Sequence, residues 1–268
     1  MLNARRNDRS PRVAALQVLL NRVGDATPKL KVDGIFMNQT AHALSRYKRD
    51  VMQQSTGASP DHADAAVWHH LMGRAGVQTV DAVDITDVGY LRTVMPWLSR
   101  HGEPITLGGM SNGLAQVIGD IARRSSGGNI MLVRFHGHGG PGLQSIAHGT
   151  RKIAGTMDYN QELTVLNSKT LQKLWGALSQ LAPAMCKFGF VELHGCRVGK
   201  GPEGAALLGS LAAVWKVPVS AGIPYAKSGY DKVAGSAVTF DLEGPIATAF
   251  PGGASLASWS SQLNASAA

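Results

Sequence analysis

The sequence lacks several features that would define a fold or a compartment at once. It contains two cysteines, Cys186 and Cys196, and aromatic residues make up only 6% of it. If both cysteines lie on one extended strand, they are about 33 Å apart. A disulfide requires Cα atoms within roughly 7 Å of each other. The two cysteines therefore cannot pair with each other, and their number indicates no redox compartment.

Long apolar runs are also missing. None reaches the about eighteen residues that a membrane-spanning helix requires, so we expect no membrane span. The first residues, MLNARRNDRSPRV, are basic but contain no apolar core, so we expect no signal peptide and synthesis in the cytoplasm. For action in the periplasm or at the cell wall, we expect delivery by a dedicated secretion route or by lysis.

Charge is present but unevenly placed. The formal net charge is +8, and residues 1–50 hold ten Lys and Arg against four Asp and Glu, which leaves +2 for the remainder. A basic N-terminal quarter favours a polyanionic partner, either nucleic acid or an anionic envelope polymer, although it can also be a merely solvated face. Aromatic residues that stack on bases are nearly absent there, so we expect no nucleic-acid partner.

Residues 11–73 have the periodicity of three short helices, with Pro11 near the start of the first. Residues 73–77 have the composition of a linker. Apolar residues make up 44% of the chain, which is enough for two domains or one large one. We therefore predict a small helical domain at residues 1–73 and a second domain at residues 78–268.

After the linker, segments typical of strands alternate with amphipathic helices. The predicted strands are 79–85, 129–135, 187–195 and 217–222, and the predicted helices are 111–125, 168–181 and 202–215. This alternation is typical of a parallel sheet with right-handed crossovers. The fold class that we expect is α/β, in which a small three-helix domain precedes a mostly parallel sheet flanked by helices.

Two of the predicted strands end on reactive side chains. The block LVRFHGHGGPG ends on His136 and His138, and FVELHGCRVGKG ends on His194 and Cys196. Ligands of open parallel sheets bind beyond the carboxyl ends of the strands. If these strands are neighbours, a histidine meets the cysteine, and an imidazole both favours the reactive thiolate and shuttles its proton. Glu192, on the same strand face, is expected to form a salt bridge at the edge of the core.

The two blocks together resemble the caspase-like, or clan CD, cysteine peptidases of bacterial type. In that clan an apolar strand ends in His-Gly, and a later strand ends in a small residue followed by Cys. The frequent clan pattern His-Gly-x-x-Gly falls on His138, Gly139 and Gly142. The resemblance implies His138 as the catalytic base, with His136 as second choice, and Cys196 as the nucleophile. It also implies the backbone N–H groups of Gly139 and Cys196 as oxyanion donors.

The resemblance covers about residues 111–225. It implies hydrolysis of a peptide bond in a peptide or protein through a thioester on Cys196, without a cofactor. The Gln-Ala-Cys sequence of caspases is absent, so a caspase-type preference for aspartate is not implied.

Two other chemistries use the same residue types. The segment LHGCRV also resembles the Cys block of L,D-transpeptidases, with His-Gly-Thr upstream at His148, but Leu193 replaces their hydroxyl residue and those enzymes are β-rich. His136, His138, His148 and Cys196 are types of zinc ligand. The Asp-His that follows His-x-His in metallo-hydrolases is missing, so we expect no metal. A peptidoglycan transpeptidase or amidase-like enzyme, and a non-catalytic envelope-binding protein, are the alternatives to a peptidase.

The N-terminal segment resembles the three-helix peptidoglycan-binding domain of cell-wall enzymes. The resemblance depends on Asp33 and Gly34 in VDGIF, on Thr40 and on Trp68. It implies binding of peptidoglycan or another anionic envelope polymer, and a helical module that only docks onto another domain or protein is the alternative. The whole chain would then be a wall-directed cysteine peptidase, for which an antibacterial effector is one fitting role.

Overall fold

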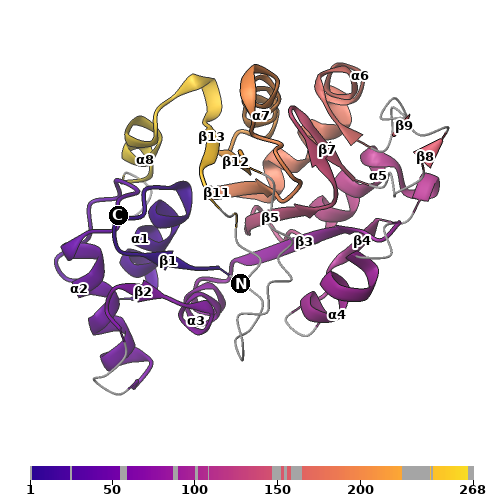
Figure 1. Cartoon of the computed structure of the whole chain (residues 1–268). Coiled ribbons are helices and arrows are strands. Elements are labelled where there is room, and N and C mark those ends of the chain that lie inside the picture. Colours follow the sequence, from indigo (N-terminus) through magenta and orange to yellow (C-terminus); the bar gives the residue numbers. More distant parts are fainter. Residues whose placement is uncertain are drawn as a thin grey trace.

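A six-stranded sheet forms the centre of the molecule (Figure 1). The computed structural model describes residues 2–24, 26–54, 59–86, 90–99, 102–107, 109–146, 152–153, 156–157, 165–224, 242 and 244–264. The strand order is β13-β12-β11-β5-β3-β4, and only β13 is antiparallel to its neighbour. The strands are β3 (Gln78–Asp84), β4 (Ile105–Leu107), β5 (Ile130–His136), β11 (Met185–Leu193), β12 (Val219–Gly222) and β13 (Ile246–Ala249). The predicted α/β class with a mostly parallel sheet is confirmed.

One face of the sheet is covered by the helices that connect the parallel strands. They are α5 (Gly109–Arg123), α6 (Ser168–Leu178), the 3-10 turn η3 (Ser179–Ala184) and α7 (Gly201–Trp215). Alternate residues of the strands, such as Val133 and Phe135 on β5, are fully buried in the hydrophobic cluster on this face. Successive side chains of a strand point to opposite faces, so their neighbours face the other layer.

The opposite face is covered by helices from both ends of the chain. They are α1 (Pro11–Val23), α2 (Asn38–Arg46), the π-helical η1 (Tyr47–Val51), α3 (Ala65–Ala75) and α8 (Leu256–Asn264). Leu132 of β5 and Phe188 and Phe190 of β11 are buried in the same hydrophobic cluster as these helices. Beside them, η2 (Tyr90–Val94) and α4 (Met95–Leu98) bury Val83 of β3. Layers of helices thus enclose the sheet on both faces.

The N-terminal helices share their core with the sheet. Their buried residues belong to one hydrophobic cluster with β5, β11 and α8. Asn264 of α8 also pairs with Val32 through two hydrogen bonds, in which the Val32 amide donates to Oδ1 at 2.8 Å and Nδ2 donates to the Val32 carbonyl at 3.1 Å. Helices are present where the sequence predicts them, but a separate three-helix domain is not confirmed.

Local sequence accounts for where several helices begin. Ser10 caps α1 by accepting a hydrogen bond from the amide of Val13, and Pro11 occupies the first helical position. Asp64 caps α3 in the same way. Asn167 and Thr170 form a reciprocal capping box at the start of α6. Such caps satisfy amide groups that have no partner within the helix.

The remaining elements are short. They are β1 (Ala4–Arg5), β2 (His62–Ala63), β6 (Gly139–Gly140), β7 (Leu143–Ser145), β8 (Lys152–Ile153), β9 (Thr156–Met157), β10 (Val165–Leu166) and the 3-10 turn η4 (Pro251–Gly253). Over the described ranges, no helix combines the length and apolar character needed to cross a bilayer.

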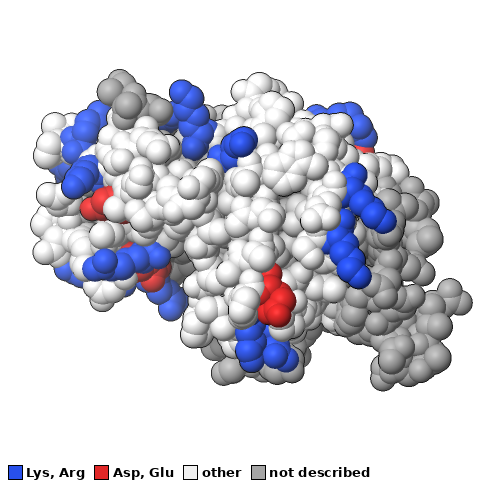
Figure 2. All heavy atoms as spheres, turned by 90° about the horizontal axis from the view of Figure 1, so that it is seen from above, with Lys and Arg blue, Asp and Glu red and all other residues white. Residues whose placement is uncertain are grey.

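Figure 2 shows the surface charge on one face of the molecule. Lys and Arg outnumber Asp and Glu on this face, and they lie in separate groups rather than in one continuous stripe.

Candidate active site

The strands that end on His-Gly and on Gly-Cys are direct neighbours. β5 and β11 pair in parallel, with Leu193 opposite Phe135, and the amide of His194 extends the ladder by donating to the carbonyl of Phe135 at 2.9 Å. Both chains therefore leave the sheet at the same edge. The two strands are thus neighbours, which was the condition for a histidine to meet the cysteine.

Two glycines allow the segments after these strands to touch. A Cβ atom built on Gly139 would lie 2.8 Å from the Cα of Gly195 and 2.6 Å from Cγ2 of Val198. A Cβ atom on Gly195 would lie 2.8 Å from the Cα of Gly139 and 2.9 Å from the carbonyl oxygen of His138. Cβ atoms in proteins are essentially never this close to other heavy atoms. The two backbones can therefore approach each other this closely only because both residues are glycines. Gly139 directly follows His138, and Gly195 directly precedes Cys196.

The side chain of Gln144 forms hydrogen bonds with both of these segments. Its side chain is fully buried. Its Oε1 accepts a hydrogen bond from the amide of Gly195 at 2.8 Å, and its Nε2 donates to the carbonyl of Ser145 at 2.8 Å and to that of His138 at 3.4 Å. The amide group thus satisfies both backbones at the glycine contact. A buried side chain with all three of these bonds restricts the separation of the two segments.

The start of α7 closes the other side of the site. The amide of Gly142 donates to the carbonyl of Val198 at 3.1 Å, and a Cβ on Gly142 would lie 2.7 Å from that of Glu203. Directly after the cysteine, Arg197 has a φ of +60°. This left-handed conformation is uncommon for a residue other than glycine, and such residues cluster at active sites.

The structure thus brings His138, Gly139 and Cys196 to one edge of the sheet. His138 and Cys196 are both half-buried. The other cysteine, Cys186, lies within β11 and is 8% exposed, and burial raises the pKa of its thiol to about 12. The two cysteines are free, as expected, and differ in their access to solvent.

His136 occupies a different place from His138. It is 2% exposed, and its Nε2 donates to Asp81 Oδ1 at 2.8 Å. Burial lowers the pKa of His136 to about 4, and the hydrogen bond to Asp81 opposes this shift. The second-choice base therefore points into a buried polar network rather than to the glycine contact.

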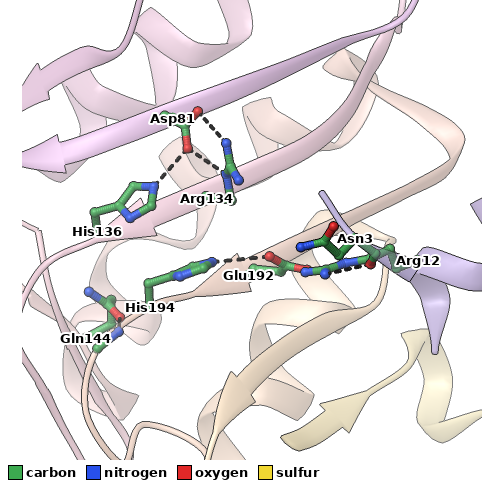
Figure 3. A network of polar contacts seen from close by, with 9 residues as sticks. Asn3, Arg12, Asp81, Arg134, His136, Gln144, Glu192 and His194 are labelled. Atoms are coloured by element: carbon green, nitrogen blue, oxygen red, sulfur yellow. Dashed lines mark hydrogen bonds and ion pairs between the residues drawn. The ribbon is translucent and has the colours of Figure 1, made fainter. Parts of the chain in front are cut away.

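This network lies on the sheet face that the N-terminal helices cover (Figure 3). On β3 and β5, Asp81 receives two hydrogen bonds from the guanidinium of Arg134, at 2.6 and 2.8 Å. Burial disfavours the ionised form of Asp81, but Arg134 and His136 together hold its pKa well below the usual range. Asp81 is therefore charged and its oxygens are occupied.

A second arm of the network links the sheet to α1. Glu192 accepts a hydrogen bond from Arg12 Nη2 at 2.6 Å and one from His194 Nε2 at 3.2 Å. Burial opposes ionisation of Glu192, yet Arg12 and His194 hold its pKa well below the usual range. The salt bridge expected for Glu192 is confirmed, and its partner comes from the N-terminal helix. Arg12 also donates to the carbonyl of Asn3 at 3.0 Å.

The residues of the peptidoglycan-binding motif fall into two places. Asp33 and Thr40 both accept hydrogen bonds from the buried Gln17, at 2.9 and 3.0 Å, and the amide of Gly34 donates to Gln17 Oε1 at 2.9 Å. Asp33 and Thr40 line a cavity of about 460 Å³. Trp68 is 1% exposed and lies instead between the core and another cavity.

Sequence reasoning missed Gln144, Asp81 and Arg12. A glutamine within GLQS and an arginine at a helix start have no signal in a single sequence, because their partners are far along the chain. Among the described residues, no cluster of three or more His, Cys, Asp or Glu is placed to hold a metal ion. His148 lies outside the described residues.

Comparison of the chain with protein-family models, with curated proteins and with solved structures finds no match.

Proposed function

We propose that the protein is a cysteine peptidase of caspase-like type that acts at the bacterial envelope. The observation that carries this proposal is the contact between Gly139 and Gly195 at the ends of two adjacent parallel strands. It sets the segments that hold His138 and Cys196 side by side, and a histidine beside a thiol is the arrangement that thiol nucleophiles require.

The reaction is transfer of an acyl group to water. His138 accepts the thiol proton as Cys196 Sγ attacks the carbonyl carbon of the scissile bond. The C–N bond then breaks, His138 returns the proton to the leaving amine, and a thioester remains on Cys196. Water, deprotonated by His138, attacks the thioester, the C–S bond breaks, the proton on His138 passes to the released Sγ, and the acid product leaves. The amides of Gly139 and Cys196 stabilise the oxyanion in both steps.

Alkylation of the two cysteines tests the dyad without knowledge of the substrate. In wild type at neutral pH, iodoacetamide should modify Cys196 much faster than the buried Cys186, which is the internal reference. The His138→Ala variant should slow modification of Cys196 by about tenfold or more. The matched control is His42→Ala on α2, where the side chain is exposed.

Equal alkylation rates in wild type and His138→Ala would refute the dyad. A positive result leads to a screen of peptide and muropeptide substrates with Cys196→Ser as the inactive control. Cleavage of peptides supports the peptidase. Changes in muropeptides alone would instead support the transpeptidase or amidase-like alternative. If the Cys196→Ser variant loses no function relative to wild type, the protein is a non-catalytic envelope-binding protein.

We also propose that the N-terminal helices direct the enzyme to peptidoglycan or another anionic polymer. The cavity beside Asp33 and Thr40 is also lined by the basic residues Arg6 and Lys31. All of its lining residues belong to the basic N-terminal quarter of the sequence. Sedimentation with purified peptidoglycan tests this, since Lys31→Glu should reduce the bound fraction. Lys187→Glu, an exposed lysine on β11, should leave it unchanged. Equal binding of the two variants would contradict the assignment of the cavity.

A further inference from the structure

A second cavity, of about 510 Å³, lies between α3, β3 and α4. Its volume is in the range of sites for small organic ligands. Most of its wall is apolar, and it includes the tryptophans Trp68 and Trp97 together with Met72 and Leu98. The cavity is separate from the glycine contact at the sheet edge, and none of the predicted catalytic residues lines it.

Two charged residues of the sheet, Asp81 and Arg134, also line this apolar cavity. Asp81 accepts from Arg134 at both oxygens and from His136 at one of them, so its capacity as an acceptor is largely used. Arg134 differs. Its bonds to Asp81 use Nε and Nη2, and no described residue accepts a hydrogen bond from Nη1.

The guanidinium of Arg134 is therefore able to bind a further acceptor. Arg134 is 6% exposed and a guanidinium has five N–H donors in a rigid fork. Trp68, which also lines the cavity, has a buried indole Nε1 without a partner among the described residues, and such a donor costs free energy. Planar carboxylates fit the guanidinium edge, and offset stacking on indole rings favours an aromatic body.

We propose that this cavity binds a small aromatic monocarboxylate, with the carboxylate on Arg134 and the ring between Trp68 and Trp97. Arg134 would then hold Asp81 on one edge and the ligand on the other. The polar residues at the mouth, His69 and Glu103, remain outside the apolar part, and Glu103 already pairs with Arg124 at 3.0 Å. The inference is independent of peptidase activity.

Calorimetry with 2-naphthoate and its neutral analogue 2-naphthamide tests the proposal on the full chain. The carboxylate should bind at one site per chain, at least about tenfold more tightly than the amide, because hydrogen bonds to charged groups are the stronger ones. Among the indole N–H resonances in an NMR spectrum, those of Trp68 and Trp97 should shift most. Absence of saturable binding, or equal affinity for both probes, would overturn the proposal.

Two variants locate the site. Ala65→Phe fills the cavity at the first turn of α3 and should weaken naphthoate binding by about tenfold or more, as expected when a ligand is sterically excluded. The matched control, Ala206→Phe, adds the same ring at an exposed position of α7 and should have no effect. Arg134→Lys keeps the charge beside Asp81 but loses the fork, so the preference for the carboxylate should shrink.

Thermal melting of each variant separates loss of the site from loss of the fold. If Arg134→Lys does not fold, Ala65→Phe with its control still decides the question. Unchanged naphthoate affinity in a folded Ala65→Phe variant would place the ligand elsewhere and refute the inference.

Discussion

The imidazole rings of His136 and His194 lie 4.8 Å apart between centroids, tilted by 38°, where β5 and β11 end. Each ring donates a hydrogen bond to its own carboxylate, Asp81 for His136 and Glu192 for His194. His136 is buried, and the neighbouring His194 disfavours its protonation. The charge on His136 therefore depends on pH.

This pair is close in the chain to the candidate active site. His136 stands two residues before His138, and His194 stands two residues before Cys196. Any shift of the pair therefore moves the segments that carry the proposed dyad, which connects the packing of the N-terminal helices to the chemistry.

Stability should fall as the pH is lowered through the range in which His136 titrates. Burial lowers the pKa of His136 from 6.5 to about 4, and nearby His194 acts in the same direction. The folded chain therefore binds this proton less readily than the unfolded chain, so stability is complete above pH 6.5 and is lost towards pH 4. The loss is on the order of 3 kcal/mol. Asp81 and Glu192, whose pKa values are lowered, add to it below about pH 4.

Urea unfolding at several pH values between 7 and 4 measures this dependence. His136→Gln removes the titrating group and should flatten the curve between pH 6.5 and 4. His69→Gln changes an exposed histidine and should keep the wild-type slope. An equally steep curve in His136→Gln would show that another group causes the pH dependence.

Replacing one partner of the ion pair between Arg12 and Glu192 should destabilise the protein more than replacing both. Side-chain exposures of 14% and 4% place it in the interior. Arg12→Met should lower the free energy of unfolding by about 3–5 kcal/mol, because it leaves a buried carboxylate without its cation. The double variant Arg12→Met, Glu192→Met should recover much of this loss.

An exposed ion pair provides the control. Arg6 and Asp61 are 41% and 43% exposed, and Arg6→Met should cost at most about 1 kcal/mol. Chemical denaturation of Arg12→Met, Glu192→Met, their double variant and Arg6→Met measures the coupling. Additive effects of the Arg12 and Glu192 changes would contradict the assignment of a buried pair.

A methyl group at the glycine contact should disrupt the site. Gly195→Ala places a Cβ 2.7 Å from Gln144 Oε1 and 2.8 Å from Gly139 Cα, where the backbone must shift. We expect a loss of about 1–3 kcal/mol in unfolding free energy, as for other overpacked positions. Gly140→Ala is the control, since a Cβ there meets no atom within 4 Å. Thermal melts measure the change in stability, and the alkylation rate of Cys196 measures the effect on the site. Equal melting temperatures and alkylation rates in the two variants would show that the glycine contact does not position Cys196.

Gln144 should act as a positioning residue. Gln144→Glu keeps the shape and the acceptor for the amide of Gly195 but loses the donor to Ser145 and His138. We expect a cost of about 1–3 kcal/mol for the unsatisfied buried groups, together with slower alkylation of Cys196 in the folded protein. Gln172→Glu at an exposed position of α6 should change neither quantity. A loss of stability with an unchanged alkylation rate would reduce Gln144 to a purely structural role.

Much of the framework could be predicted from local patterns. The continuous apolar run before His136 and the run before His194 indicate buried parallel strands, and Ser10 with Pro11 indicates a helix start. The strands β4 and β13 were not predicted, because three and four residues are too few to show the alternation of apolar and polar residues that indicates a strand. The helix α8 also escaped prediction.

The sequence alone determined which residues stand at the ends of the strands, because the alternation of strands and helices makes a parallel sheet whose carboxyl ends share one edge. Only the tertiary structure decided that His136 turns inward to Asp81, that Arg12 reaches Glu192 across 180 positions, and that Gln144 joins the two loops. These contacts depend on which faces pack together, and a buried polar group takes whichever partner the packing brings within hydrogen-bonding distance.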